Sequence, residues 1–112
     1  MNTKILGTTG EILAKEYLQK QGYKILKTNF SCKLGEIDII AQKNDRIIFI
    51  EVKARTSAKF GYPREAVTIY KQNKIRQVAM IYLQQTNNTN SNLRFDVIEI
   101  LGEKITHLEN AF

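Results

Sequence analysis

Hydrophobic residues recur along two segments of the chain at the spacing of an α-helix. The first segment spans residues 8–21, and Gly22 follows it as a residue suited to a left-handed helix end. The second helix is expected from about Ala66 to Gln84. The apolar stripes comprise Leu6, Leu13, Ala14, Tyr17 and Leu18 for the first helix, and Ile75, Val78, Ala79, Tyr82 and Leu83 for the second.

Short runs of β-branched and aromatic residues predict strands between and after these helices. We expect strands over residues 23–30, 36–41, 46–54 and 93–101, with a short strand over 104–108. Asn44 and Asp45 are turn residues, so the second and third strands should pair as an antiparallel hairpin. A loop containing Gly61 and the only proline, Pro63, should follow over residues 54–64. The order α-β-β-β-α-β predicts one α/β domain over residues 1–112, with helices flanking a mixed sheet.

Charged residues interrupt two of these strands where a buried sheet would carry apolar side chains. Asp38 stands within a run of isoleucines, and Glu51 and Lys53 interrupt the apolar run that begins at Ile47. Because side chains alternate along a strand, Glu51 and Lys53 should share one face of the sheet. These three residues are therefore candidates for a functional site.

The predicted hairpin would bring the two acids together. With a two-residue turn, Asp38 lies directly opposite Glu51, and Glu36 lies opposite Lys53. Facing Cβ atoms would then be roughly 4.5–5.5 Å apart, so the carboxylates would repel unless a cation lay between them. Carboxylate oxygens select Mg²⁺ or Mn²⁺, and the chemistry expected of such a site is phosphodiester hydrolysis. The alternative is a surface ion pair between Lys53 and either Glu36 or Glu51.

Composition narrows the class of protein. Of the 112 residues, 43% are hydrophobic and 25% are charged, as is usual for a globular domain. No apolar run approaches the roughly 20 residues of a membrane span, and the N-terminus lacks the apolar core of a signal peptide. The single cysteine, Cys32, allows neither an intrachain disulfide nor a cysteine zinc cluster. We therefore expect a cytoplasmic protein with no membrane partner.

The net charge of +6 favours a polyanionic partner, because each phosphate that is neutralised releases condensed counterions. Candidate nucleic-acid-binding residues lie in the predicted loop and on the second helix: Arg55, Lys59, Lys71 and Lys74. The alternatives are a surplus charge that serves only solubility and an ordinary solvated helix face. Asp96 is expected in a turn-end or cross-strand pair, and His107 and Cys32 are expected to be structural.

The residues around the acids resemble a known superfamily. GEIDII followed by FIEVKAR is similar to the core of the PD-(D/E)xK nucleases, with Ile37 in place of the proline of the literal motif. Over nearly the whole chain, further segments resemble the YraN-like (UPF0102) family, whose fold is similar to archaeal Holliday-junction resolvases. These segments are GEILAKEYLQKQGYKIL, Asn29, Phe60-Gly61, Lys71, RFDVIEI and the final ENAF.

The resemblance implies a restriction-endonuclease-like fold and assigns roles to individual residues. Asp38 and Glu51 would be the metal carboxylates, and Lys53 would orient or activate water. Glu11 would match the acid on the first helix of the resolvases, as a fourth catalytic residue. Alternatively, Thr8-Thr9-Gly10-Glu11 spells a capping box, in which Glu11 bonds back to the backbone N–H of Thr8 if the helix begins there.

The expected activity is that of a Mg²⁺- or Mn²⁺-dependent endodeoxyribonuclease that cleaves structured DNA. Resolvase-like cleavage would place two sites on one junction and would therefore need a homodimer. One alternative is a nucleic-acid-binding module that keeps the nuclease fold without turnover, and another is a protein-interaction role with a vestigial site. The sequence leaves open whether the substrate is DNA or RNA and whether it is branched or linear.

Overall fold

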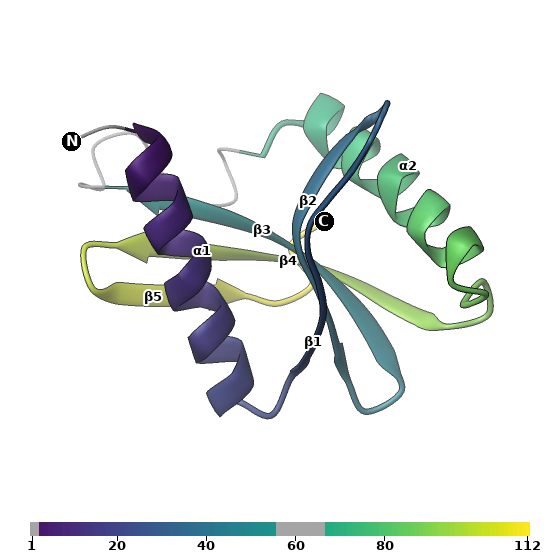
Figure 1. Ribbon diagram of the computed structural model, residues 1–112, viewed down its shortest axis with the longest axis horizontal. Helices are drawn as coiled ribbons and strands as arrows, with labels where there is room; N and C mark the ends of the chain where they lie inside the picture. The colour runs from purple at the N-terminus through teal and green to yellow at the C-terminus, as the bar shows by residue number, and fades with distance from the viewer. Residues whose placement is uncertain (1–2, 56–66) are drawn as a thin grey trace.

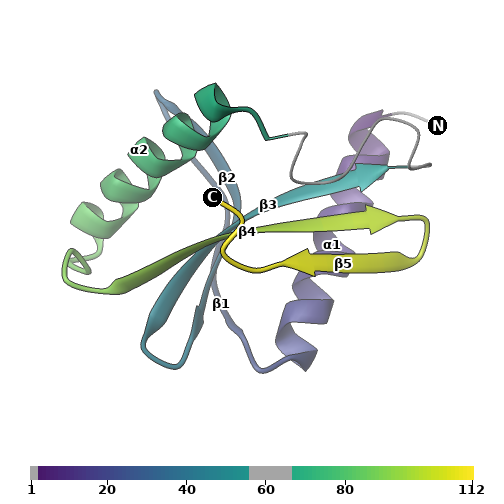
Figure 2. The same cartoon turned by 180° about the vertical axis from the view of Figure 1, so that it is seen from behind.

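Two helices cover opposite faces of one sheet in the part of the chain that the structure, a computed structural model, describes, namely residues 3–55 and 67–112 (Figure 1). In chain order the elements are α1 (Thr3–Lys20), β1 (Lys24–Cys32), β2 (Gly35–Lys43), β3 (Arg46–Arg55), α2 (Ile69–Gln85), β4 (Asn92–Leu101) and β5 (Lys104–Leu108). Helix α1 lies in front of the sheet in Figure 1 and behind it in Figure 2. The predicted α/β fold with its α-β-β-β-α-β order is confirmed, and the short strand predicted over residues 104–108 is β5.

The strands lie in the sheet in the same order as in the chain, β1-β2-β3-β4-β5. Strands β1, β2 and β3 form an antiparallel meander, β4 joins β3 in parallel after the α2 crossover, and β5 returns antiparallel to β4. Lys43 pairs with Arg46, so the hairpin has the predicted two-residue turn. Asn44 has a φ of +56°, which asparagine tolerates better than most residues do.

Several boundaries differ from those predicted. Helix α1 begins at Thr3 rather than at residue 8, although Gly22 does follow it with a φ of +90°. Strand β3 continues to Arg55, so the connection to α2 begins later than predicted, and residues 56–66 of that loop lie outside the described part of the chain. Helix α2 begins at Ile69, because the hydroxyl of Thr68 caps it by accepting the backbone N–H of Lys71 at 3.2 Å.

Each helix packs on its own hydrophobic cluster. Ala14 and Leu18 of α1 pack against Ile39, Ile48 and Ile50 of the sheet. On the other face, the α2 stripe predicted from the sequence is buried at all five positions: Ile75, Val78, Ala79, Tyr82 and Leu83. Because Phe49 belongs to the α2 cluster and Glu51 follows it by two residues, Glu51 and Lys53 point to the α2 side of β3.

Strand β2 departs from a regular ladder at Asp38. Ile37 packs in the α2 cluster and Ile39 in the α1 cluster, although regular alternation would put them on one face. The β2–β3 register runs from Lys43–Arg46 to Ile39–Ile50 and stops there. The predicted facing pairs beyond it, Asp38 with Glu51 and Glu36 with Lys53, are therefore wrong as ladder pairs, because β2 diverges from β3 at this point.

Helix α1 lies close to β3 at Gly10. A Cβ atom at Gly10 would lie 2.7 Å from Cβ of Ala54, whose side chain cannot move without its strand. Replacing glycine inside a helix by alanine normally gains about 1 kcal/mol, but this clash opposes the gain. We predict that Gly10→Ala lowers the free energy of unfolding by about 1–3 kcal/mol, measured by urea denaturation. Thr9→Ala on the exposed side should be neutral or mildly stabilising, and a stabilised Gly10→Ala would contradict the close approach.

Candidate active site

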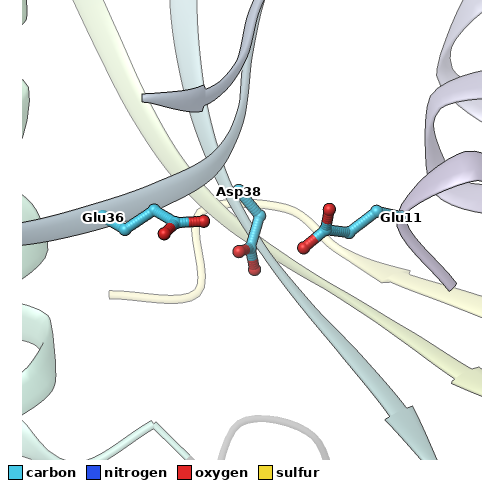
Figure 3. A group of neighbouring side chains, drawn as sticks. All are labelled: Glu11, Glu36 and Asp38. Carbon is cyan, nitrogen blue, oxygen red and sulfur yellow. The ribbon is translucent and has the colours of Figure 1, made fainter. Parts of the chain in front are cut away.

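Three carboxylates converge where β2 leaves β3. Glu11 projects from α1, and Glu36 and Asp38 project from β2 toward it (Figure 3). Each offers one oxygen, and these three oxygens lie within 4.8 Å of one another. The alternative interpretation of Glu11 as a helix cap is wrong, because α1 begins at Thr3 and Glu11 lies well inside the helix.

Asn29 links two of these carboxylates. It lies on β1 between the pairs Thr28–Ile39 and Phe30–Ile37, so that it faces Asp38 across the ladder. With its amide nitrogen toward the acids, Asn29 donates to Oε2 of Glu11 at 3.1 Å and to Oε1 of Glu36 at 3.0 Å. Its φ of +52° is uncommon within a strand, and such strained residues cluster at functional sites.

Asp38 is held by the backbone of the neighbouring strand. Its Oδ2 accepts the N–H of Val52 at 2.8 Å, a hydrogen bond that the β2–β3 ladder no longer supplies. Burial raises the pKa of Asp38 to about 7, and the charges of Glu51 and Glu11 act in the same direction. Burial also raises the pKa of Glu11; the hydrogen bond from Asn29 opposes that shift, and the charge of Glu36 adds to it. The carboxylates are thus crowded beyond what the nearby cations offset.

Glu51 is 6% exposed and faces two lysines. Its Oε1 lies 2.5 Å from Nζ of Lys71 on α2 and 3.5 Å from Nζ of Lys53 on its own strand. Burial lowers the pKa of Lys53, and its contact with Lys71 lowers this pKa further. The negative charge of Glu51 acts to raise the pKa of Lys53 but does not outweigh the other two effects. Burial also acts to lower the pKa of Lys71, but its hydrogen bond to Glu51 and the charge of Glu51 outweigh burial and raise it. The structure therefore brings Asp38, Glu51 and Lys53 into one charged cluster, with Lys71 as an added member.

The residues that were predicted to contact nucleic acid differ from one another in the side chains that surround them. Lys71 pairs with Glu51, and Arg55 lies 3.3 Å from Oε1 of the buried Glu99, so both cations meet acids of their own chain. Lys74 lies 5.5 Å from the ring centroid of Tyr70. Lys59 lies outside the described residues.

Sequence reasoning missed two members of this region. Asn29 was singled out only by the family resemblance, although an asparagine within a strand can indicate a positive φ. Glu99 was not singled out; it pairs with Lys53 in the β3–β4 register, on the same face of the sheet. Glu99 could have been recognised from the alternation of side chains along β4, because it follows the buried Val97 by two residues and so shares its face of the sheet.

Asp96 belongs to a separate network that ties the C-terminal strands together. It is fully buried and accepts hydrogen bonds from Nε and Nη2 of Arg94, at 2.9 and 2.8 Å, and from the backbone N–H of Asn110 at 2.9 Å. Nε2 of His107 lies 2.7 Å from its Oδ2. The expectations that Asp96 would be paired and His107 structural agree with this network.

The donor set of the convergent acids suits a hard cation. Glu11, Glu36 and Asp38 offer oxygen ligands, the kind that Mg²⁺ and Mn²⁺ prefer. A divalent charge there would offset the cost of ionising Asp38, which comes from its burial and from the negative charge of Glu51. By contrast, Glu51 is paired with lysines, so it lies beside the convergent set rather than within it.

The cost of ionising Asp38 leads to a prediction for the metal-free protein. Asp38→Asn keeps an oxygen that can accept the N–H of Val52 and removes the charge. We expect the variant to be more stable than the wild type by about 0.5–2 kcal/mol at pH 8.5. The raised pKa makes the ionised Asp38 costly only at high pH, so the gain should shrink as pH falls through about 7 toward the ordinary value of 3.8.

Thermal melts with and without millimolar Mg²⁺ or Mn²⁺ measure this effect. Metal should stabilise the wild type more than Asp38→Asn, because only the wild type keeps the ionised ligand. A structural ion pair would give the opposite result: the variant would be destabilised, and metal would change neither protein.

The element order places the chain among α/β proteins of the restriction-endonuclease-like arrangement. The model of the Uncharacterised protein family UPF0102 matches residues 10–100, and the chain belongs to this family. A UPF0102 protein of Alkaliphilus oremlandii is 53% identical over 118 aligned residues, covering all of both chains. Others from Clostridioides difficile and Caldanaerobacter subterraneus are 50% and 47% identical, covering all of this chain and 100% and 98% of theirs. No described helix is long and apolar enough to cross a membrane.

Proposed function

We propose that this protein is a metal-dependent endonuclease that hydrolyses phosphodiester bonds in structured DNA in the cytoplasm. The observation that carries the proposal is the convergence of Glu11, Glu36 and Asp38 beside the Glu51–Lys53–Lys71 cluster. Such a cluster combines oxygen donors for a hard cation with positive charge for a phosphate. A carboxyl with a raised pKa costs stability when it is ionised, and a purely structural role for Asp38 would not explain why the fold contains one here.

The acidic residues of the site would bind the metal ion, and their neighbours would hold them in position. A bound Mg²⁺ or Mn²⁺ would polarise the phosphate and lower the pKa of a water. Glu11, Glu36 and Asp38 would hold the cation, while Asn29 keeps Glu11 and Glu36 in place through its amide. The hydrogen bond from Val52 fixes Asp38 in the direction of the other acids.

The lysines would act on the substrate side. Lys53 has a lowered pKa, so near neutral pH it can exchange a proton with a water more readily than an ordinary lysine can. Lys71 keeps its charge because Glu51 raises its pKa, and it can stabilise the negative charge that develops on the phosphate. Glu51 would position both ammonium groups.

The test is cleavage of a panel of branched and linear DNA and RNA substrates with Mg²⁺ or Mn²⁺. A Glu51→Ala variant purified in the same way provides the control for a contaminating nuclease. Metal-dependent cleavage by the wild type that Glu51→Ala loses would support the proposal. Equal cleavage by both proteins, or none by the wild type on any substrate, would overturn it.

A second candidate is a nucleic-acid-binding module without turnover. The observation in its favour is that Glu51 is already neutralised by Lys53 and Lys71, so part of the cluster is satisfied without metal. Binding of the panel in the absence of cleavage would favour this candidate. Sedimentation on a four-way junction would show whether two copies bind it, as resolvase-like cleavage by a homodimer requires.

A further inference from the structure

A pocket adjoins the candidate active site at the start of α2. It has a volume of about 350 Å³ and is lined by Gly35 and Glu36 of β2, by the cap residue Thr68, and by four residues of the first turns of α2: Tyr70, Lys71, Lys74 and Ile75. Glu36 belongs to the convergent acids, and Lys71 contacts Glu51. A group that fills the pocket would therefore lie beside the phosphate that the proposed endonuclease cleaves.

One large aromatic side chain of this pocket faces solvent. Tyr70 lines it and is 73% exposed. Ile69 and Leu34, which adjoin the lining residues in sequence, are 73% and 40% exposed. The exposed ring of Tyr70 therefore offers a flat surface at this pocket on which a planar group can stack.

The charges beside Tyr70 favour a nucleotide over an apolar protein segment. Nζ of Lys74 lies 5.5 Å from the ring centroid of Tyr70, within reach of a phosphate attached to a base on that ring. An apolar partner would instead desolvate Lys74 and the carboxylate of Glu36, which is unfavourable without new polar contacts. An aromatic face beside a cation is the arrangement by which proteins hold unpaired nucleotides.

We propose that this pocket receives an unpaired base next to the scissile phosphate, with Tyr70 stacking on the base and Lys74 contacting its phosphate. This inference rests on the proposed function and narrows its substrate class to DNA with an unstacked nucleotide at the cleavage position. A base inside an intact duplex is stacked on its neighbours and must be extruded before it can enter. The pocket thus selects for loops, flaps and mismatched ends.

The test is a binding measurement without divalent metal, so that it does not depend on cleavage. The probes are a duplex with one unpaired 2-aminopurine and the same duplex with that base paired. We expect the wild type to prefer the unpaired probe by about tenfold and to change its fluorescence on binding. Tyr70→Phe should retain both effects. Tyr70→Ala should lose the fluorescence change and about tenfold in affinity, and Lys74→Gln should weaken binding of both probes.

Met80→Ala is the matched control, because Met80 is 48% exposed on the same helix but does not line the pocket. Unchanged affinity and fluorescence in Tyr70→Ala would overturn the inference while leaving the proposed cleavage intact. If Tyr70→Ala changes the sedimentation of the protein alone and not its DNA binding, the patch is a contact between copies, which also overturns it. Stacking without cleavage in the substrate panel would instead count against the endonuclease and in favour of the subsite.

Discussion

Asp38→Ala should reduce the single-turnover rate of metal-dependent DNA cleavage by at least about 100-fold, with the fold intact. The reason is that Asp38 is the acid shared by both parts of the site: its oxygens approach Glu11 and Glu36, and its pKa responds to Glu51. Removing one preorganised electrostatic group typically costs about 10²–10³-fold in rate. Circular dichroism and thermal melting would show that folding is retained.

Because these residues act as one unit, the losses should not add. The Asp38→Ala/Glu51→Ala double variant should cleave hardly more slowly than either single variant. Glu16→Gln, an exposed change five residues after Glu11 on α1, should keep the wild-type rate. If Asp38→Ala cleaved at the full rate, the chemistry would have to lie elsewhere in the molecule.

Asp96→Ala should be among the most destabilising single substitutions, with a loss of about 3–5 kcal/mol in the free energy of unfolding. Asp96 is fully buried, and its removal leaves the guanidinium of Arg94, only 12% exposed, without its close counter-charge. The N–H of Asn110 and the ring of His107 would lose a partner in the same step. A domain of this size has only about 5–15 kcal/mol of stability in total.

Acid should reproduce part of this loss in the wild type. Burial acts to raise the pKa of Asp96, but its hydrogen bonds with His107, Arg94 and Asn110 outweigh burial and lower it. Stability from a lowered pKa is present above the ordinary value of 3.8 and is lost as pH falls through the folded-state value. Urea denaturation at pH 7 and pH 3 measures both effects. Because protonation of Asp38 stabilises the wild type over the same pH range, the quantity to compare is the difference in stability between the two proteins at each pH. A difference as large at pH 3 as at pH 7, or an Asp96→Ala variant within 1 kcal/mol of the wild type at pH 7, would contradict the role given to this network.

Periodicity was sufficient to predict the elements of the fold, because each is a short segment whose burial pattern is local. The α2 stripe and the Asn44-Asp45 turn followed from residue type alone. The start of α1 could not be predicted in this way, since the apparent cap at Thr8 and Glu11 fits the capping pattern as well as a true helix start does.

The candidate site was predictable in its members more than in its geometry. Asp38, Glu51 and Lys53 stood out because charge interrupted apolar strands. Their arrangement depends on the divergence of β2 from β3, and a residue count that assumes a regular ladder cannot contain that divergence. Likewise, the contact of Lys71 with Glu51 joins residues brought together only by the α2 crossover.

The positive φ of Asn29 also has a consequence for solubility. Among the described strands, β1 lies at an edge of the sheet, and its outer backbone groups pair with none of those strands. Such an edge could template the addition of a strand from another molecule. That edge is interrupted twice, by the register shift between Ile25 and Lys27 and by the positive φ of Asn29, and it carries the exposed Lys24 and Lys27. An approaching strand would meet a kinked, positively charged edge on which a continuous ladder cannot extend. The backbone irregularity that directs the Asn29 amide to Glu11 and Glu36 thus also protects the protein from edge-to-edge aggregation.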